Sequence, residues 1–426
     1  MIKIIVDEKE ELDMSKFIQK MKNIGPGALV AAAFIGPGTV TTCTRAGATS
    51  GYTLLWAMLF STIATIVFQE MSSRLGLVTK KGLAENIREK MPSGPIRTIA
   101  ILLVIVAIFV GNSAYETGNI TGGIMGFTTL VPGVPMQAIV IVISLLAIAL
   151  LWSGSYKAIE KVLTGIVILM AVVFTITAIA SHPDWGAVAK GLVTPKSGGN
   201  DLMTVIGLIG TTVVPYNLFL HASSTAERWD GVENLGDARM DTIISIGLGG
   251  LVSMGIIVAA AANMYGSGVE IASGADLALA VEPVMGEWAK WFLGIGLLAA
   301  GFSSAIAAPL AAAFATTGSL GWKADLKDMK FKGVWLFIIV LGAILAIALG
   351  ASPTQLILVA QAANAIILPL IAFFLLYCVN SKEMGQYKNG IINNLLGIVI
   401  IIICCFICYR NMTSFIQTLQ ALLAAQ

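Results

Sequence analysis

Long stretches without a single charged residue constrain the fold of this chain more than any other feature. Such runs cover 117–156, 162–183, 242–269, 291–322, 333–381 and 389–409. Because a membrane-spanning helix needs about 20 apolar residues, the longest runs must each hold two helices and a turn. Only 12% of the 426 residues are charged, whereas about one quarter is usual in soluble domains. The runs show no period-two alternation, which favours helices over a membrane β-barrel.

Turn signals divide the chain into eleven predicted membrane spans. A Val-Pro-Gly-Val-Pro segment at 131–135 and a Gly-Ala-Ser-Pro segment at 350–353 mark two of the turns. The predicted spans are 24–49, 53–75, 97–129, 135–153, 158–181, 202–223, 241–264, 291–318, 333–350, 354–378 and 391–409. We therefore expect an all-α polytopic membrane protein, with a cytoplasmic N-terminal tail at 1–23.

The distribution of Lys and Arg predicts how these spans are oriented. With the N-terminus in the cytoplasm, the basic residues left outside the cell are Arg45, Lys190, Lys196, Lys290 and Arg410. Since cytoplasmic loops carry an excess of Lys and Arg, we expect a multi-pass protein of the plasma (inner) membrane with its N-terminus inside. An odd number of spans then puts the C-terminus outside.

The first span contains Gly36-Pro37-Gly38 near its middle, where a continuous helix would not place them. Pro37 has no N–H, so the carbonyl of Ala33 loses its helical partner, and the flanking glycines allow the chain to leave helical geometry. A simple kink is the ordinary outcome of one proline in a membrane helix. A full break has to lie against protein or water, because an unpaired carbonyl is costly in hydrocarbon.

The sixth span repeats this feature in the segment "GTTVVPYNLFLHAS" at 210–223. Pro215 frees the carbonyl of Thr211 in the same way, and Tyr216 and Asn217 place polar atoms beside the interruption. Paired interruptions at matching positions of two halves favour an inverted-repeat transporter over two chance kinks. We predict one repeat over 24–181, a second, inverted repeat over 202–378, and an extra helix over 391–409.

The chemistry at the two interruptions predicts a hard cation as the ligand. Each half-helix that ends at a break presents carbonyl oxygens and the negative end of its dipole. Neutral oxygens come from Thr39, Thr41, Tyr216 and Asn217, and neither break contains a thiolate, thioether or carboxylate. Such a set suits a cation that keeps part of its water, as Mg²⁺ tends to do.

Three segments resemble the Nramp family of divalent-metal transporters: "GPGALVAAAFIGPGTVTTCTRAGATSGYTLLW" (25–56), "SRLGLVTKKGLAE" (73–85) and "GTTVVPYNLFLHASS" (210–224). The resemblance continues in spacing over nearly the whole chain. It implies a LeuT-like fold, in which ten helices form two inverted five-helix repeats, here with one extra helix. It also implies the transport of divalent metal ions by alternating access.

Four positions depart from the metal-binding motifs of that family. Typical members read Asp-Pro-Gly-Asn where this chain has Gly36-Pro37-Gly38-Thr39, and Met-Pro-His-Asn where it has Val214-Pro215-Tyr216-Asn217. The resemblance therefore implies the loss of a carboxylate, of a sulfur ligand and of a histidine linked to proton movement. A branch of the family with an altered site of this kind has Mg²⁺ as a substrate. We expect partly hydrated Mg²⁺ as the substrate, tolerance of Mn²⁺, and proton coupling that is weak or absent.

The predicted metal site adds two amides of the tenth span to these motifs. Gln361 aligns with a family glutamine near the metal, and Asn364 lies three residues later on the same helix face. An interhelical hydrogen bond is the alternative role for either amide. The full predicted set is Ala33, Gly36, Thr39, Thr211, Val214, Tyr216, Asn217, Gln361 and Asn364.

Two further polar residues are expected beside this site. Glu116 lies deep in the third span and matches an acidic position of the family, so we expect it to accept hydrogen bonds from metal-bound water. The alternative is a neutral carboxylic acid bonded to Asn112 or Thr121. His221 matches a second histidine of the family, and we assign it a structural or gating role rather than direct coordination.

Other functions stay open from the sequence alone. An amino-acid permease of the same LeuT-like fold would bind a substrate carboxylate through N–H groups at the unwound glycines. A proton-coupled Mn²⁺/Fe²⁺ transporter and a non-transporting membrane scaffold or metal sensor are further alternatives. An enzyme is not expected, because no nucleophile–base pair, metal-ligand cluster or nucleotide loop emerges. We expect a metal ion and the lipid bilayer as partners, no cofactor, no nucleic acid and a monomeric state.

Overall fold

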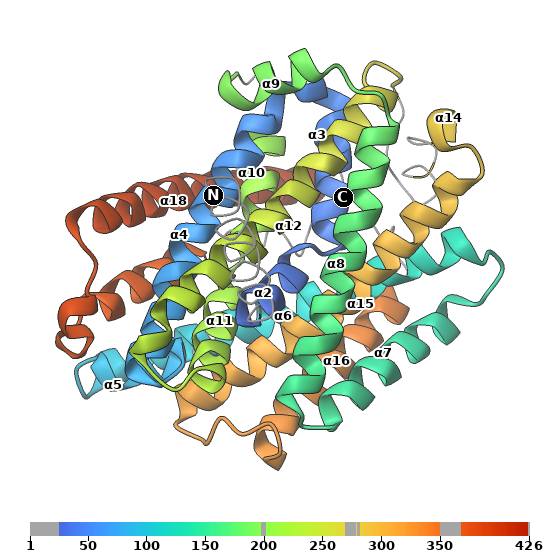
Figure 1. The fold of residues 1–426 in the computed structure, drawn as a ribbon. Coiled ribbons are helices and arrows are strands. Elements are labelled where there is room, and N and C mark those ends of the chain that lie inside the picture. Colours follow the sequence, from blue (N-terminus) through green and yellow to red (C-terminus); the bar gives the residue numbers. More distant parts are fainter. Residues whose placement is uncertain (1–24, 197–201, 269–277, 279–281, 350–367, 425–426) are drawn as a thin grey trace, which may run out of the picture.

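The protein was analysed as a computed structural model, which describes residues 25–196, 202–268, 278, 282–349 and 368–424. Its helices pack side by side, and no β-strand occurs in this described part of the chain (Figure 1). The helices are α2 (Pro26–Phe34), α3 (Pro37–Ser50), α4 (Leu55–Thr79), α5 (Leu83–Lys90), α6 (Pro95–Leu130), α7 (Met136–Trp152), α8 (Tyr156–Ala180), α9 (Trp185–Val193), α10 (Leu202–Thr212), α11 (Pro215–Arg228), α12 (Leu235–Met264), α14 (Glu282–Met285), α15 (Trp288–Leu320), α16 (Met329–Leu349) and α18 (Ile391–Ala424). Three short 3₁₀ turns join them: η1 (Gly51–Leu54), η2 (Val232–Asn234) and η3 (Lys382–Tyr387).

Most predicted spans coincide with these helices to within a few residues. The unbroken spans two to five and seven to nine are confirmed as α4, α6, α7, α8, α12, α15 and α16. Within the described residues, seven helical stretches are long and apolar enough to cross a membrane, and the shorter apolar helices Met136–Trp152, Leu368–Val379 and Ile391–Phe406 account for further predicted spans. The predicted span 354–378 lies mostly outside the described residues.

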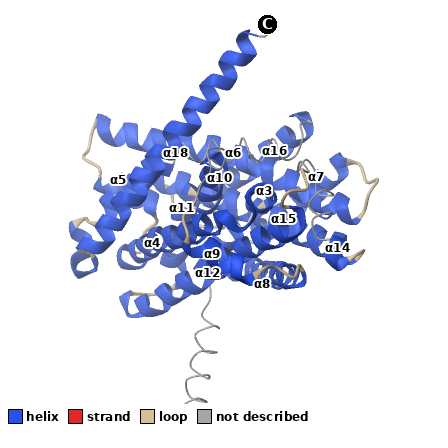
Figure 2. Cartoon of the chain, turned by 90° about the horizontal axis from the view of Figure 1, so that it is seen from above, coloured by secondary structure: helices blue, strands red, loops and turns tan. Residues whose placement is uncertain are grey.

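The helix that contains the last predicted span, 391–409, is longer than that span. The helix α18 continues to Ala424 and projects away from the other helices (Figure 2). The reason is local: residues 410–424 contain neither Gly nor Pro, so nothing in the backbone stops the helix where the apolar run ends.

Two short helices, α5 and α9, were not predicted, because their eight and nine residues are too few to span a membrane. At the beginning of each helix, a carboxylate accepts hydrogen bonds from backbone N–H groups. The Glu85 carboxylate accepts the N–H of Gly82 at 2.7 Å, and the Asp184 carboxylate accepts the N–H groups of Gly186 and Ala187 at 2.9 and 3.1 Å. Such caps satisfy N–H groups that the first helical turn leaves unpaired.

The centre of the bundle is built on small residues of α15. A Cβ atom added to Gly301 would lie 2.5 Å from the backbone nitrogen of Gly123 on α6, and one added to Gly126 would lie 2.8 Å from the carbonyl of Gly294. Residues without side chains therefore let α6 and α15 approach closely, which is how membrane helices gain packing energy. This contact brings the middle of α15 against the interrupted first span.

The half-helix α2 is anchored at its beginning by a buried carboxylate from α12. Asp241 accepts the backbone N–H of Gly27 at 2.7 Å and that of Gly25 at 3.1 Å, and Ser245 donates to the same carboxylate at 3.1 Å. A carboxylate at this end complements the helix dipole and the unpaired first-turn N–H groups. The far end of α2, which carries the first break, is thus held at a fixed position.

Candidate functional site

The interruption predicted in the first span is confirmed. The helix α2 ends at Phe34, and α3 begins at Pro37. Gly36 between them is extended, with φ −95° and ψ 178°. Its carbonyl accepts the N–H of Val40 at 3.1 Å, so Gly36 serves as the N-cap of the second half-helix.

The interruption predicted in the sixth span is confirmed as well. The helix α10 ends at Thr212 and α11 begins at Pro215. Val214 is extended, with φ −95° and ψ 125°, and its carbonyl accepts the N–H of Asn217 at 3.2 Å. The carbonyls of Gly36 and Val214 thus each already bind one N–H of the helix that follows.

The two breaks touch one another in the interior of the protein. The hydroxyl oxygens of Thr39 and Thr211 lie 2.6 Å apart, and the Tyr216 hydroxyl donates to the carbonyl of Ala33 at 3.2 Å. The Thr39 hydroxyl also contacts the carbonyl of Phe34. In this conformation, the carbonyl that Pro37 frees is therefore bonded to the opposite break rather than left open.

One hydroxyl from a third helix, that of Ser304, also reaches the carbonyl that Pro37 frees, and sequence reasoning missed it. Ser304 of α15 donates to the carbonyls of Ala33 and Ala32 at 3.1 and 3.2 Å, and Ser303 donates to the carbonyl of Ala32 at 3.1 Å. The available signal was the polar pair Ser303-Ser304 inside an otherwise small and apolar run.

Asn217 differs from most buried polar residues because its fully buried amide forms no hydrogen bond with a described residue. Among the described residues, neither its oxygen nor its nitrogen has a hydrogen-bond partner, and the hydroxyl of Thr41 is likewise without one. A buried polar group without a partner costs free energy that a packed interior normally avoids. These atoms are where a bound ligand would find unused oxygen lone pairs.

Glu116 is fully buried beside the first break. Its carboxylate accepts the amide N–H of Asn119 at 3.4 Å, so the alternative partners predicted for it, Asn112 and Thr121, are wrong. Both of those side chains instead bond to carbonyls of their own helix, one turn earlier. A helical residue contacts the residues three and four positions away, and the three-residue spacing to Asn119 is the one the chain uses.

His221 is fully buried and contacts a residue of α4. Its Nδ1 lies 3.0 Å from the Oε1 of Gln69, and its Nε2 has no hydrogen-bond partner among the described residues. One ring nitrogen held by a neighbouring helix is the arrangement expected of the structural or gating role. Gln361 and Asn364 lie outside the described residues.

The oxygen atoms that face each other at the two breaks are neutral. Carbonyl oxygens come from Ala33 and Thr211, and the side chains of Thr39, Tyr216 and Asn217 add hydroxyl and amide oxygens. Over the part of the chain that is described, no group of three or more His, Cys, Asp and Glu side chains comes together. The geometry therefore suits a hard cation with retained water better than a soft metal held by sulfur or nitrogen.

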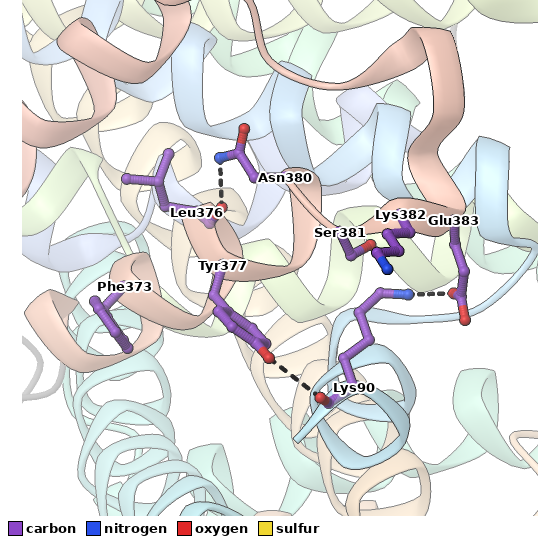
Figure 3. Close-up of a pocket in the computed structure, with 8 residues that line it drawn as sticks. All are labelled: Lys90, Phe373, Leu376, Tyr377, Asn380, Ser381, Lys382 and Glu383. Atoms are coloured by element: carbon purple, nitrogen blue, oxygen red, sulfur yellow. Dashed lines mark hydrogen bonds and ion pairs between the residues drawn. The ribbon is translucent and has the colours of Figure 1, made fainter. Parts of the chain in front are cut away.

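A surface pocket of about 630 Å³ lies elsewhere, where α5 meets η3 and the helix Leu368–Val379 (Figure 3). Lys90 forms an ion pair with Glu383 across it, and the Tyr377 hydroxyl donates to the carbonyl of Lys90 at 3.2 Å. Its lining residues are Lys90, Phe373, Leu376, Tyr377, Asn380, Ser381, Lys382 and Glu383. None of them belongs to the helices that carry the breaks, so we do not assign the metal site here.

The ion pair in this pocket is expected to contribute little to stability. Replacing Glu383 by Gln should lower the free energy of unfolding by less than about 1 kcal/mol at neutral pH, because the carboxylate is more than half exposed. The hydrogen bond from Lys90 lowers the pKa of Glu383, so the stabilisation is present above the pKa of an unfolded glutamate and is lost as the pH falls through the folded-state pKa. Thermal melts of both proteins at decreasing pH should converge, and a difference that widens on acidification would contradict this.

Comparison with known proteins gives one consistent family. The family model described as natural resistance-associated macrophage protein-like (Nramp) matches residues 27–414. A divalent metal cation transporter MntH of Yersinia pestis (strain Pestoides F) is 27% identical over 392 residues, which cover 90% of this chain and 93% of that protein.

Solved structures agree on the fold. The crystal structure of the Eremococcus coleocola manganese transporter, in complex with an aromatic bis-isothiourea substituted compound, superimposes with a TM-score of 0.81 at 23% identity, over 94% of this chain and 88% of that one. MhsT in complex with L-phenylalanine superimposes with a TM-score of 0.60 at 16% identity, over 91% and 98% of the two chains. The predicted LeuT-like fold is confirmed by these likenesses.

Proposed function

Because the chain belongs to the natural resistance-associated macrophage protein-like (Nramp) family, we propose that it carries divalent metal cations across the membrane by alternating access. Mg²⁺ with part of its hydration shell is the proposed substrate, and Mn²⁺ is a second one. The curated relatives are named as transporters of divalent metal cations, not as enzymes, in line with the expectation that this chain is no enzyme.

One observation carries the choice of substrate: in the described part of the chain, the contacts between the two helix breaks are made by neutral oxygen atoms. Thr39 contacts Thr211 across the gap, Tyr216 reaches the carbonyl of Ala33, and the amide of Asn217 is buried without a partner among the described residues. Mg²⁺ prefers oxygen ligands and gives up its water reluctantly. Hydroxyls, amides and carbonyls can bind the waters of such an ion without stripping them all.

The residues that are missing support the same substrate. Position 36 has no carboxylate and position 214 has no sulfur, since they are Gly36 and Val214. Thioether and thiolate ligands favour softer metals, whereas neutral oxygen ligands do not favour softer metals over hard ones. We infer that this site does not prefer soft metals, and that Mn²⁺ binds to it because its chemistry as a hard cation is similar to that of Mg²⁺.

The proposed transport is driven by the membrane potential rather than by protons. Each positive charge that moves into a negative interior gains about 2.3 kcal/mol per 100 mV, and Mg²⁺ carries two. Tyr216 occupies the position before Asn217, where the resemblance implies a histidine linked to proton movement. Proton coupling is therefore proposed to be weak or absent.

The proposed topology follows the positive-inside rule. The N-terminus is in the cytoplasm, the C-terminus is outside, and the protein acts as a monomer in the plasma membrane. The two inverted repeats are proposed to cover 24–181 and 202–378, with 391–409 as the extra span. Gln361 and Asn364 on the tenth span are proposed to complete the metal site.

A proton-coupled manganese transporter is the second candidate function. The names of the relatives support manganese as its metal, because one is a divalent metal cation transporter MntH and another is a manganese transporter, but they do not mention protons. The two candidates differ in what accompanies the metal. Only the second requires that protons enter with it.

Proteoliposomes with the full chain distinguish the candidates. We expect Mg²⁺ and Mn²⁺ to enter faster as the interior is made more negative, with no acidification of the lumen reported by an internal pH dye. Metal entry with matched acidification would reject the uncoupled mechanism and support the second candidate. Uptake of L-amino acids, competing with Mg²⁺, would instead favour a permease, and the entry of no divalent cation would refute the proposed function.

A further inference from the structure

The space beside Gly36 is filled by a side chain of another helix. A Cβ atom added to Gly36 would lie 2.8 Å from the hydroxyl oxygen of Ser304 and 3.5 Å from its Cβ. The third nearest atom is the amide oxygen of Asn119, at 3.7 Å. The hydroxyl of Ser304 therefore sits where a side chain at position 36 would begin.

We propose that Ser304 sets the metal selectivity of the first break: its hydroxyl, which lies where a side chain at position 36 would begin, is the neutral oxygen that contacts the hydrated cation. This inference rests on the proposed function, since it assigns a residue to the same site. The neutral hydroxyl of Ser304 takes the place of a carboxylate beside Gly36, and a carboxylate there would contact the ion directly.

The surroundings of Ser304 show that its position is fixed. The side chain is fully buried, and its hydroxyl lies 3.1 Å from the carbonyl of Ala33 and 3.2 Å from that of Ala32. A serine hydroxyl has one hydrogen to donate and two lone pairs to accept with. While the hydrogen points to the carbonyls at the end of α2, the lone pairs remain for a metal-bound water.

Polar atoms continue from this point toward a buried carboxylate. Asn119, which is the next polar group beside Gly36, donates its amide N–H to Glu116 at 3.4 Å. The second oxygen of Glu116 has no partner among the described residues. A hydrated cation held at Ser304 thus has a buried carboxyl group nearby, behind the amide of Asn119 rather than in direct contact with the ion.

Ser303 provides a matched control in the same helix turn. It is as fully buried as Ser304, and its hydroxyl also donates to the carbonyl of Ala32, at 3.1 Å. Its other partner is the carbonyl of Ala300 in its own helix. Ser303 is not among the three nearest atoms to the space beside Gly36, so its loss removes a comparable hydrogen bond without touching that space.

The test compares Mg²⁺ uptake by proteoliposomes that contain wild-type protein, Ser304→Ala or Ser303→Ala. Ser304→Ala should raise the KM for Mg²⁺ by about tenfold, the effect of one lost ligand contact, whereas Ser303→Ala should stay within about twofold of wild type. Equal KM values for wild type and Ser304→Ala would overturn the proposal. Equal losses in both variants would overturn it too, because they would indicate a structural role.

A variant that gains affinity for a soft metal provides a test that does not depend on lost activity. Ser304→Cys keeps the size and neutrality of the side chain but offers a soft sulfur ligand, so Cd²⁺ should inhibit Mg²⁺ uptake at concentrations at least about tenfold lower than in wild type. An unchanged Cd²⁺ inhibition curve for a folded Ser304→Cys protein refutes the assignment of Ser304. Failure of the proposed function itself looks different, because wild-type protein would then carry no divalent cation at all.

Discussion

Replacing Asn217 by Ala is expected to lower divalent-metal uptake by at least about tenfold while leaving the protein folded and no less stable. The amide is fully buried, and neither of its polar atoms has a partner among the described residues. Removing a buried polar group that bonds to no described residue costs none of the hydrogen bonds that the structure describes. The loss should appear only when the cation needs that oxygen, at a magnitude of about 1.4 kcal/mol per tenfold change. Uptake assays and thermal melts of the same preparation measure both effects.

A second buried asparagine gives the opposite pattern and serves as the control. Asn86 is also fully buried, but its amide donates to the hydroxyl of Thr79 and to the carbonyl of Gly82, both at 2.9 Å. Asn86→Ala should therefore lower the melting temperature and leave the KM for Mg²⁺ unchanged. Normal uptake by Asn217→Ala, or a loss of stability as large as that of Asn86→Ala, would remove Asn217 from the metal site.

The second large effect is expected from Gly76→Ala, which should separate α4 from α11. A Cβ atom at this position would overlap the carbonyl oxygen of Ala222, a backbone atom that cannot move aside alone. Helix propensity favours Ala over Gly by about 1 kcal/mol, so a loss of stability would be due to the steric overlap. Because α11 carries Asn217 and His221, we expect a lower melting temperature together with impaired uptake.

Gly165→Ala in α8 tests whether the effect is specific to that contact. An added Cβ there meets no atom within 4 Å, so only the gain in helix propensity remains, and the melting temperature should stay the same or rise. The account of the α4–α11 contact would be wrong if the two variants melted at the same temperature.

The helix breaks could be predicted from the sequence because their cause is local. A proline without an N–H, flanked by residues that tolerate an extended backbone, determines where Pro37 and Pro215 interrupt their spans. The membrane spans were equally accessible, since the absence of charge over about 20 residues is a property of the sequence itself. The end of α18 was missed because hydropathy describes where lipid contact ends, not where a helix ends.

What the sequence could not predict is which groups meet across the site. Ser304 comes from a helix far along the chain, and its contact with Ala33 depends on how closely α15 packs against the first span. The partner of Glu116 depended on which of several nearby amides the helix face presents. That the amide of Asn217 has no partner among the described residues was beyond prediction as well, because partners of a buried amide come from other helices.

In this structure the two breaks are joined by hydrogen bonds, which a transported cation has to replace. Thr39 and Thr211 contact each other, and Tyr216 and Ser304 bond to the carbonyl of Ala33. An entering cation must replace these hydrogen bonds with bonds to itself or to its waters. Because one set of polar contacts is exchanged for another, the empty and loaded sites can lie close in free energy, as alternating access requires.

Crystals of the protein soaked in Mn²⁺ and measured for anomalous scattering test the central claim most directly. Mn²⁺ stands in for Mg²⁺ because both are hard cations with oxygen ligands, and it can be located by its own signal. We predict one anomalous peak between the two breaks, beside Asn217 and the carbonyl of Thr211, that is lost when excess Mg²⁺ is added. A peak held at another site, or breaks that stay closed and empty while the protein transports Mn²⁺ in liposomes, would contradict the account.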